Sequence, residues 1–217
     1  MRLFADTAHL PDLEELVSWG AIDGVTTNPT LLSREEGDPE EILQRICDLV
    51  QGPVSAEVTA TDWEGMVREG KHLAGLHEHI VVKIPATVDG LKATRALARE
   101  GIRVNMTLVF TPMQALLAAK AGARYVSPFI GRLDDISSYG MNLVADILEI
   151  YEHYDFETEV LVASVRHPMH VLEAARLGAP IVTAPPRVIR QLIRHPLTDI
   201  GLEKFLADWK KVQERRK

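Results

Sequence analysis

The chain has 217 residues, a length that fits one large hydrophobic core better than two full-sized domains. Hydrophobic residues make up 46% of the chain and charged residues 25%, so the composition excludes a protein too polar to fold. The net charge is −7, and the only dense basic run is at residues 215–217, so we expect no nucleic-acid partner.

The cysteine content and the first residues indicate where the protein works. Cys47 is the single cysteine and has no partner for an internal disulfide. Polar residues at Arg2, Asp6 and His9 interrupt the segment in which a signal peptide needs an apolar run. No stretch approaches the roughly 20 apolar residues of a membrane span. We therefore expect a cytoplasmic protein with no membrane partner.

Short apolar or β-branched runs recur along the whole chain and predict strands. The eight predicted strands are Leu3–Asp6, Gly24–Asn28, Val54–Val58, Ile80–Ile84, Arg103–Val109, Tyr125–Ile130, Glu159–Val165 and Ile181–Ala184. The runs begin about 25 residues apart on average, which suits a strand, a crossover helix and two short loops.

Segments with helical spacing lie between these runs. The eight predicted helices are Leu10–Trp19, Glu40–Val50, Trp63–Leu76, Gly90–Arg99, Met113–Lys120, Met141–Tyr154, Met169–Leu177 and Arg187–Ile193. A ninth helix, Leu202–Gln213, follows the last strand–helix unit. The pattern predicts a single (β/α)₈ barrel domain over residues 1–217 with an additional C-terminal helix over 202–217. A doubly wound open sheet is the alternative that periodicity alone leaves open.

Polar residues stand at positions that a closed barrel turns inward. In the strand that begins at Ile80, Lys83 shares a face with Val81 and would point into the barrel near the carboxyl ends of the strands. The same alternation applied to six strands is expected to turn eight polar or aromatic residues inward. They are Asp6, Glu57, Lys83, Asn105, Thr107, Ser127, Phe129 and Ser164. A barrel core normally takes branched aliphatic side chains there, so these polar groups would be costly without a function.

Each of these residues also has an ordinary structural interpretation. Lys83 could be a solvated lysine that protects a strand edge from pairing. Asp6 could cap a turn, and Thr107 could satisfy a backbone carbonyl.

The combination of residue types suits carbonyl chemistry. A lysine among apolar neighbours loses solvation, which favours the neutral amine that attacks a carbonyl and forms a Schiff base. Glu57 and Asp6 are the available acid and base, and Thr107 could hold a water between Glu57 and the imine. Asn28, Asn105 and Ser127 could bind the hydroxyls of a dihydroxyacetone-like unit.

Two arginines follow adjacent predicted strands. Arg132 comes after the sixth strand, and Ser164 and Arg166 come with the seventh, an arrangement that suits a phosphate group. The alternative is that either arginine forms a salt bridge with an acidic neighbour such as Asp134. The pairs His77/His79 and His167/His170 lack further ligands at metal spacing and are interpreted as surface histidines, so no metal is expected.

Four blocks of the sequence resemble one family over essentially the whole chain. The blocks Val25-Thr26-Thr27-Asn28-Pro29-Thr30, Val82-Lys83-Ile84-Pro85, Asn105-Met106-Thr107-Leu108-Val109-Phe110 and Gly131-Arg132 look like those of the small transaldolases. The resemblance implies a Schiff base at Lys83, Asp6 as acid and base for carbon–carbon cleavage, and Glu57 with Thr107 as activators of the catalytic water. It also places Thr26 among the substrate-binding residues.

The family also contains fructose-6-phosphate aldolases, and two positions separate the branches. This chain has Glu57 and Phe129, and the transaldolases of the family have Glu and Phe at these positions. The aldolases have Gln and Tyr there. The resemblance therefore implies transfer of a dihydroxyacetone unit from sedoheptulose 7-phosphate to glyceraldehyde 3-phosphate in the non-oxidative pentose phosphate pathway. Fructose-6-phosphate aldolase activity is one alternative; a barrel that binds sugar phosphates without turnover, with Lys83 purely structural, is another.

The resemblance also bears on cofactors and assembly. It implies no metal and no organic cofactor. It implies a ring-shaped homo-oligomer, commonly a decamer of two pentameric rings, in which the C-terminal helix packs on a neighbouring subunit. Phe205, Leu206 and Trp209 are apolar enough for that docking, and packing on the chain's own barrel is equally compatible with the sequence.

Overall fold

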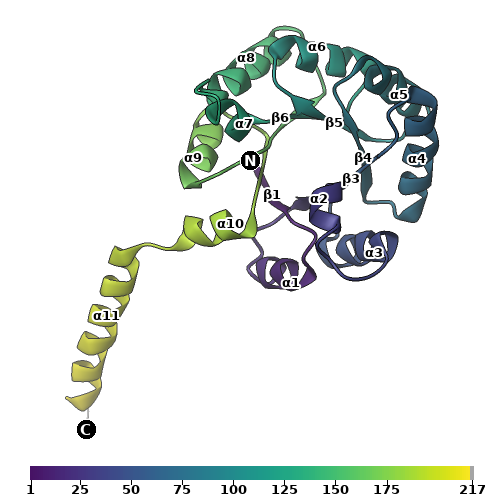
Figure 1. Cartoon of the computed structure of the whole chain (residues 1–217). Helices are drawn as coiled ribbons and strands as arrows, with labels where there is room; N and C mark the ends of the chain where they lie inside the picture. Colours follow the sequence, from purple (N-terminus) through teal and green to yellow (C-terminus); the bar gives the residue numbers. More distant parts are fainter. Residues whose placement is uncertain (216–217) are drawn as a thin grey trace.

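Parallel strands form a closed barrel in the computed structural model, which describes residues 1–215 (Figure 1). Within these residues the strands are β1 (Arg2–Asp6), β2 (Gly24–Thr26), β3 (Val54–Glu57), β4 (Ile80–Pro85), β5 (Val104–Val109), β6 (Tyr125–Pro128), β7 (Glu159–Val162) and β8 (Ile181–Ala184). Each strand pairs with the next in chain order, and β8 closes the barrel against β1. The predicted (β/α)₈ barrel is confirmed, and the open doubly wound sheet is wrong.

Helices surround the strands, most of them in a ring outside the barrel (Figure 1). In the described part of the chain they are α1 (Leu10–Ser18), α2 (Pro29–Leu32), α3 (Pro39–Val50), α4 (Trp63–Leu76), α5 (Val88–Arg99), α6 (Pro112–Ala121), α7 (Ile130–Asp134), α8 (Gly140–His153), α9 (Pro168–Arg176), α10 (Pro186–Ile193) and α11 (Pro196–Glu214). Side-chain caps explain several starts, because Asp38, Asp62, Thr87 and Thr111 each accept a backbone N–H from the first turn that follows.

The strand faces divide the interior into two apolar layers. Outward residues of β4, such as Val82 and Ile84, pack with Met66 of α4 and Leu97 of α5 between strands and helices. The barrel interior holds a second cluster, one residue from each of five strands: Phe4, Val81, Tyr125, Leu161 and Ile181. Two positions further along the same five strands stand Asp6, Lys83, Ser127, Ala163 and Thr183. Because side chains alternate along a strand, these residues face inward above the apolar cluster, toward the carboxyl ends.

Two short helices replace residues that we predicted as strand ends. The second strand stops at Thr26, and Asn28 caps α2 by accepting the backbone N–H of Leu31 at 3.0 Å. The sixth strand stops at Pro128, and α7 begins at Ile130. The predicted strands to Asn28 and to Ile130 are therefore too long. Helices of four and five residues are too short for a 3.6-residue period to reveal them.

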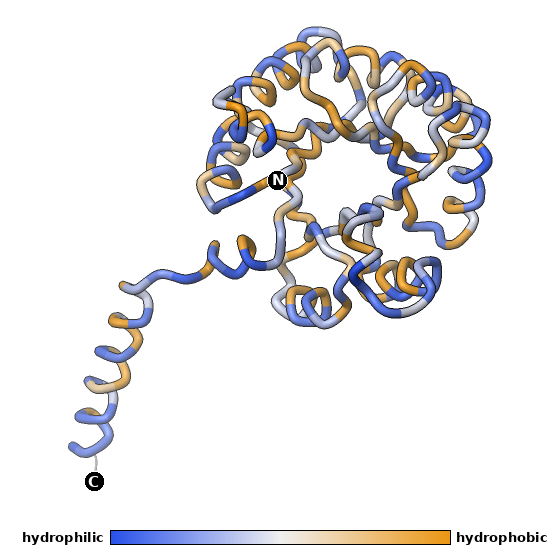
Figure 2. Tube along the Cα trace, viewed as in Figure 1, coloured by the Kyte–Doolittle hydropathy of each residue, from blue (hydrophilic) through white to orange (hydrophobic). Residues whose placement is uncertain are grey.

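The C-terminal helix begins earlier than predicted and leaves the barrel. Helix α11 starts at Pro196 rather than Leu202, with His195 accepting the backbone N–H of Leu197. It projects away from the ring of helices (Figure 1), and apolar and polar residues alternate along it (Figure 2). None of its described residues is buried, so it does not pack on its own barrel. Residues 216 and 217, the end of the predicted helical segment and of the basic run, lie outside the described residues.

Candidate active site

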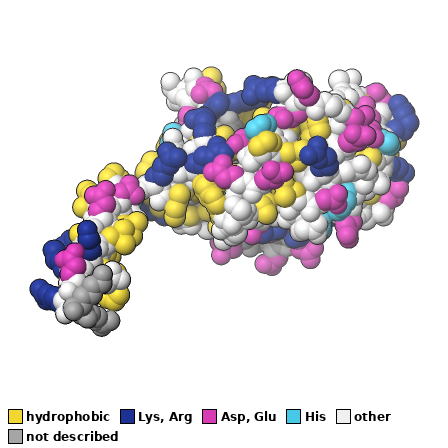
Figure 3. All heavy atoms as spheres, turned by 90° about the horizontal axis from the view of Figure 1, so that it is seen from below, with side chains coloured by type: hydrophobic (Ala, Val, Ile, Leu, Met, Phe, Trp, Pro, Cys, Tyr) yellow, Lys and Arg dark blue, Asp and Glu magenta, His cyan; other side chains and the backbone are white. Residues whose placement is uncertain are grey.

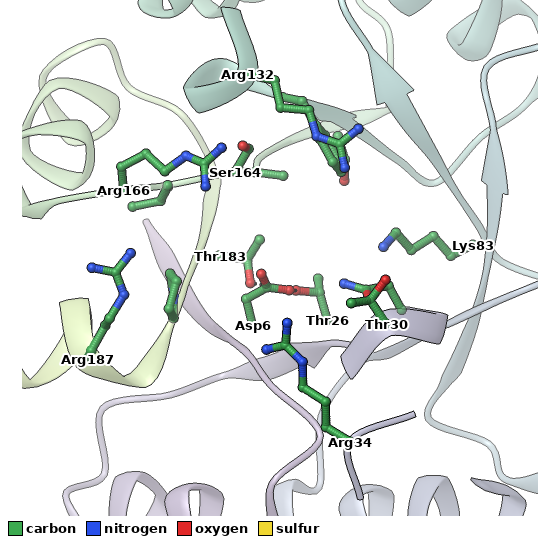
Figure 4. A pocket seen from close by; sticks show the side chains of 16 residues that line it. Asp6, Thr26, Thr30, Arg34, Lys83, Arg132, Ser164, Arg166, Thr183 and Arg187 are labelled. Atoms are coloured by element: carbon green, nitrogen blue, oxygen red, sulfur yellow. Dashed lines mark hydrogen bonds between the residues drawn. The ribbon is translucent and has the colours of Figure 1, made fainter. Parts of the chain in front are cut away.

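The carboxyl ends of the strands surround a cavity of about 410 Å³ (Figure 4). Its walls carry the polar residues of five strands and the loops that follow them. The lining consists of Asp6, Thr26, Asn28, Thr30, Arg34, Lys83, Ser127, Phe129, Arg132, Ala163, Ser164, Val165, Arg166, Thr183, Pro185 and Arg187. Nine of the twelve residues proposed from the sequence are in this lining. Of the other three, Glu57 and Thr107 line an adjoining cavity of about 370 Å³, to which Lys83 also belongs.

Lys83 is a buried cation inside the barrel. Its side chain is only 5% exposed, and its Nζ lies 3.0 Å from Glu57 Oε2. The same nitrogen donates a hydrogen bond to the backbone carbonyl of Thr27 at 3.0 Å. The pairing register explains the contact, since Glu57 on β3 stands directly opposite Lys83 on β4. The two groups can therefore exchange a proton without rearrangement of the strands.

Asp6, at the end of β1, carries a perturbed carboxyl group. The hydroxyl of Thr26 donates to Asp6 Oδ1 at 2.8 Å, and the hydroxyls of Thr26 and Thr183 are 2.7 Å apart. Burial raises the pKa of Asp6 above its ordinary value, while the Thr26 hydrogen bond and the Lys83 charge oppose that rise. A carboxyl group tuned in this way can hold or release a proton closer to neutral pH than an exposed aspartate.

Thr107 has a buried hydroxyl without a hydrogen-bond partner among the described residues. Its side chain is fully buried. It lines the smaller cavity together with Glu57 and Lys83. Buried hydroxyls are nearly always satisfied by protein or by ordered water, so this position suits a water or a substrate oxygen.

Asn105 is hydrogen-bonded to Ser127 of the cavity wall and to Ser55. Ser127 donates its hydroxyl to Asn105 Oδ1 at 2.9 Å, and the Asn105 amide donates to the Ser55 hydroxyl at 3.1 Å. Asn105 is fully buried and lines neither cavity, whereas Ser127 lines the larger one. This chain of side chains fixes the orientation of the Ser127 hydroxyl.

Arginines surround the side of the cavity away from Lys83. Figure 4 shows Arg166 and Arg187 across the opening from Lys83, with Arg132 and Arg34 on either side. Arg132 lies over the ring of Phe129, 5.1 Å from the ring centre. Arg166 forms a salt bridge of 2.8 Å with Asp135, and not with Asp134. Among the described residues, no acidic group comes within salt-bridge distance of Arg132.

The backbone between β6 and β7 sets the position of this arginine group. Ile130 and Gly131 of α7 donate their N–H groups to the carbonyls of Ala163 and Ser164, each at 3.1 Å. A side chain on residue 131 would collide with the Ser164 carbonyl and approach Arg166 Nε to 2.6 Å, so only glycine fits. The loop after β7 is thus held against α7.

Ser164 reaches the cavity for a reason other than the one predicted. Leu161 faces the barrel interior, so alternation would turn Ala163 inward and Ser164 outward. Strand β7 ends at Val162, however, and Ser164 adopts a φ of 62°, which turns it into the cavity lining. The predicted strand to Val165 is wrong, while the placement of Ser164 at the site agrees with the structure.

The sequence interpretation missed four polar lining residues. Thr183 lies two positions after the interior residue Ile181, so the alternation applied to the other strands would have found it. Arg187 is the second residue of α10, the helix after β8, and the start of this helix is a common location for phosphate contacts in such barrels. Thr30 belongs to α2 and Arg34 to the turn that follows it, neither of which the sequence pattern predicted.

One of the four paired histidines, His170, differs from its predicted surface placement. The rings of His77 and His79 are 5.1 Å apart, and those of His167 and His170 are 3.8 Å apart. His170 is only 5% exposed, so its interpretation as a surface histidine is wrong. In residues 1–215, no group of three or more His, Cys, Asp or Glu side chains is arranged to hold a metal ion.

No helix of the described residues has the length and apolar character that crossing a membrane requires.

Fold and site together define the class: a (β/α)₈-barrel enzyme whose strand ends hold a lysine–carboxylate pair facing a group of arginines. The comparisons with known proteins identify the family. Residues 3–216 match the family model described as transaldolase/fructose-6-phosphate aldolase. The chain therefore belongs to the transaldolase/fructose-6-phosphate aldolase family.

Curated relatives cover the chain from end to end. A probable transaldolase of Anaeromyxobacter sp. (strain K) is 58% identical over 217 residues, all of both chains. A probable transaldolase of Petrotoga mobilis (strain DSM 10674 / SJ95) is 57% identical over 214 residues, covering 99% of this chain and 97% of the relative. A probable transaldolase of Thermodesulfovibrio yellowstonii (strain ATCC 51303 / DSM 11347 / YP87) is 58% identical over 214 residues, 99% and 100% of the two chains.

Proposed function

We propose that the protein is a transaldolase that moves a dihydroxyacetone unit from sedoheptulose 7-phosphate to glyceraldehyde 3-phosphate through a Schiff base on Lys83. The products are erythrose 4-phosphate and fructose 6-phosphate, which assigns the enzyme to the non-oxidative pentose phosphate pathway. The observation that carries the proposal is the buried Lys83 ammonium 3.0 Å from the Glu57 carboxylate, on the wall of a cavity rimmed by arginines. The names of the curated relatives support the transaldolase branch.

The first chemical step belongs to Lys83 and Glu57. Glu57 accepts the proton that Lys83 must lose before its Nζ attacks the ketone carbon of the donor sugar. The resulting carbinolamine loses water when its hydroxyl is protonated, and Glu57 returns the proton for that step through a water held by Thr107. The unpartnered Thr107 hydroxyl in the same cavity supports this role.

Asp6 performs the proton transfer at the bond that breaks. It removes the proton of the C4 hydroxyl as the C3–C4 bond cleaves, and the bonding electrons pass into the iminium to give an enamine on Lys83. The aldehyde leaves, the acceptor aldehyde binds, and its carbonyl oxygen receives the proton back from Asp6 as the new bond forms. Water then adds to the resulting iminium, and the C–N bond breaks to release fructose 6-phosphate and restore Lys83. The raised pKa of Asp6 supports this, since the group must both take and give a proton within one cycle.

The other residues bind the two ends of the sugar. Ser127, Asn28 and Asn105 are assigned to the dihydroxyacetone unit, Asn105 acting through Ser127, and Thr26 holds Asp6. Arg132, Arg166 and Ser164 are assigned to the phosphate, with Arg187 and Arg34 on the same rim. The chemistry is complete with protein side chains, so we propose no metal and no organic cofactor.

Fructose-6-phosphate aldolase activity is the second candidate, because the matched family includes it. Phe129 favours transfer over hydrolytic release of dihydroxyacetone. It lines both cavities, its ring stacks edge-on against Phe110 at 6.0 Å, and it offers no hydroxyl to a water near the enamine.

Trapping and product analysis test the mechanism together. Incubation with fructose 6-phosphate and borohydride should add the mass of a reduced dihydroxyacetone unit to Lys83 of the wild type. The Lys83→Met variant should gain no such adduct and should have no transfer activity. Absence of the adduct, or activity in Lys83→Met, would leave a barrel that binds sugar phosphates without this chemistry. Free dihydroxyacetone released without an acceptor, as fast as transfer, would instead make the enzyme an aldolase.

We also propose a cytoplasmic homo-oligomer, a decamer of two pentameric rings, in which α11 packs on a neighbouring subunit. One domain, residues 1–217, supplies both barrel and helix. Support comes from the exposed apolar side chains of α11, a helix that stands clear of the barrel in Figure 3: Leu197, Ile200, Leu202, Phe205, Leu206, Trp209 and Val212. A monomer that left these in water would expose an apolar patch typical of protein interfaces.

A further inference from the structure

A buried histidine connects the two loops that carry the arginine group. His170 lies on α9 with 5% exposure and points toward the loop after β7. Its Nδ1 accepts the backbone N–H of Arg166 at 3.2 Å. Its Nε2 lies 2.9 Å from Asp134 Oδ2, at the end of α7. Both ring nitrogens are thus used, one on the Arg166 loop and one on the helix that carries Arg132.

These contacts require one protonation state and one tautomer. An Nδ1 that accepts from a backbone N–H carries no proton, so the ring is neutral and its single proton is on Nε2, directed at Asp134. A second proton on Nδ1 would oppose the Arg166 N–H, donor against donor. Protonation of His170 therefore breaks the contact with the Arg166 backbone.

The Asp134 carboxylate completes the connection. Its Oδ1 accepts the backbone N–H of Gly140 at 2.8 Å while its Oδ2 faces His170, so it joins α7, α8 and α9. The neighbouring Asp135 forms the salt bridge with the Arg166 guanidinium. Arg166 is consequently held at its backbone by His170 and at its side chain by Asp135.

We propose that neutral His170 is a positioning residue that holds the Arg166 loop against α7, so that Arg132, Ser164 and Arg166 together bind a substrate's phosphate group, and that protonation of His170 weakens this binding. The proposal rests on the proposed function for the identity of the substrate. It assigns His170 no contact with substrate, since His170 lines neither cavity.

The charged surroundings of His170 determine the direction of its response to pH. Burial and the nearby His167 lower the pKa of His170, while Asp134 and the more distant Glu173 of α9 oppose that effect. Two other charged groups near the loop after β7, Asp135 and Arg166, form a salt bridge with each other. Glu173 accepts a hydrogen bond from the Tyr139 hydroxyl. The ring therefore stays neutral at physiological pH, and phosphate binding should weaken in acid.

Three variants separate positioning from simple structural support. His170→Asn places an amide oxygen where Nδ1 was and keeps an acceptor for the Arg166 N–H, but it cannot titrate. His170→Gln keeps a donor for Asp134 and loses that acceptor. His170→Leu removes both contacts. His153→Leu, at the exposed end of α8, is the matched control.

The measurements are the KM for fructose 6-phosphate, the KM for unphosphorylated D-glyceraldehyde as acceptor, and the binding of inorganic phosphate by calorimetry. We expect His170→Gln to raise the KM for fructose 6-phosphate about tenfold and to weaken inorganic phosphate similarly, with little change in kcat or in the KM for D-glyceraldehyde. His170→Asn should stay within about threefold of the wild type at pH 8. His153→Leu should match the wild type throughout.

The pH series supplies the second test. The substrate phosphate itself titrates near pH 6, so wild type and His170→Asn are compared at each pH from 8 to about 5. The wild type should lose phosphate affinity in acid more steeply than His170→Asn. Parallel pH profiles would overturn the pH dependence.

Equal phosphate affinity in His170→Gln and wild type, or equal losses with phosphorylated and unphosphorylated substrates, would overturn the positioning role. If His170→Leu fails to fold, the comparison of His170→Asn with His170→Gln still decides. Wild-type protein that binds inorganic phosphate in this way but forms no borohydride adduct on Lys83 would keep the positioning role and remove the proposed function.

Discussion

Gly131 offers a sharp test of how the arginine group is built. A methyl group on residue 131 would overlap the Ser164 carbonyl oxygen and lie 2.6 Å from Arg166 Nε and 2.9 Å from Arg166 Cγ. Ordinary carbon contacts are about 3.5 to 4.0 Å, so α7 and the loop after β7 must separate by more than the arginine side chain alone can yield. Gly131→Ala therefore breaks the Gly131–Ser164 hydrogen bond and moves Arg166.

The expected magnitude follows from those two effects. Loss of one backbone hydrogen bond costs about 1 kcal/mol, and overpacking costs about 1–3 kcal/mol, so Gly131→Ala should lower the free energy of unfolding by about 2–4 kcal/mol. Because the displaced groups include Arg166 and Ser164, the KM for fructose 6-phosphate should rise at least about tenfold. Dihydroxyacetone trapping on Lys83, across the cavity, should persist.

Urea unfolding and steady-state kinetics measure both quantities. Gly75→Ala is the matched control, since Gly75 is an exposed residue of α4 with open space around an added methyl group. It should stabilise the protein by up to about 1 kcal/mol and leave the KM unchanged. A Gly131→Ala protein as stable as the wild type, with the same KM, would refute the account of how α7 meets the loop after β7.

Three further changes address the remaining parts of the proposal. Phe129→Tyr should increase the release of free dihydroxyacetone from fructose 6-phosphate without an acceptor, measured enzymatically, and no increase would count against the role of Phe129. Asp6→Asn should lower kcat by about 10²–10⁴-fold. Burial raises the pKa of Asp6, so the wild type loses stability as the pH rises through that pKa and Asp6 ionises. Urea unfolding at pH 4 and pH 7 should therefore show that the variant gains stability relative to the wild type at the higher pH. Trp209→Glu combined with Phe205→Glu should reduce the mass measured by light scattering, and an unchanged mass would exclude α11 as the oligomer contact.

The period of two along a strand explains why much of the site was predictable. Once Val81 is assigned to the barrel interior, Lys83 must face the same way, and the rule transfers to Glu57 on the neighbouring strand. Parallel pairing in chain order then brings the two into register as a salt bridge. These contacts follow from local geometry and barrel closure, which the repeating strand–helix pattern indicates.

The rest of the site depends on contacts that a local pattern does not contain. Ser164 was placed correctly through an incorrect strand end, since its positive φ rather than alternation turns it inward. Helix α2 brings Thr30 and Arg34 to the cavity through a cap at Asn28, a single-residue signal. His170 was assigned to the surface because its partner Asp134 lies on another helix and is 36 positions earlier in the sequence.

The division between the two halves of the cavity has a physical reason. Lys83 and Glu57 stand on paired strands, where the barrel hydrogen bonds fix the distance between them. The phosphate side must instead hold an anion against a net charge of −7, and the guanidinium groups gathered there repel one another. Asp135 on Arg166 and the Phe129 ring beneath Arg132 offset that repulsion without filling the cavity. Loops and a five-residue helix can carry this half because backbone hydrogen bonds join α7 to the loop after β7.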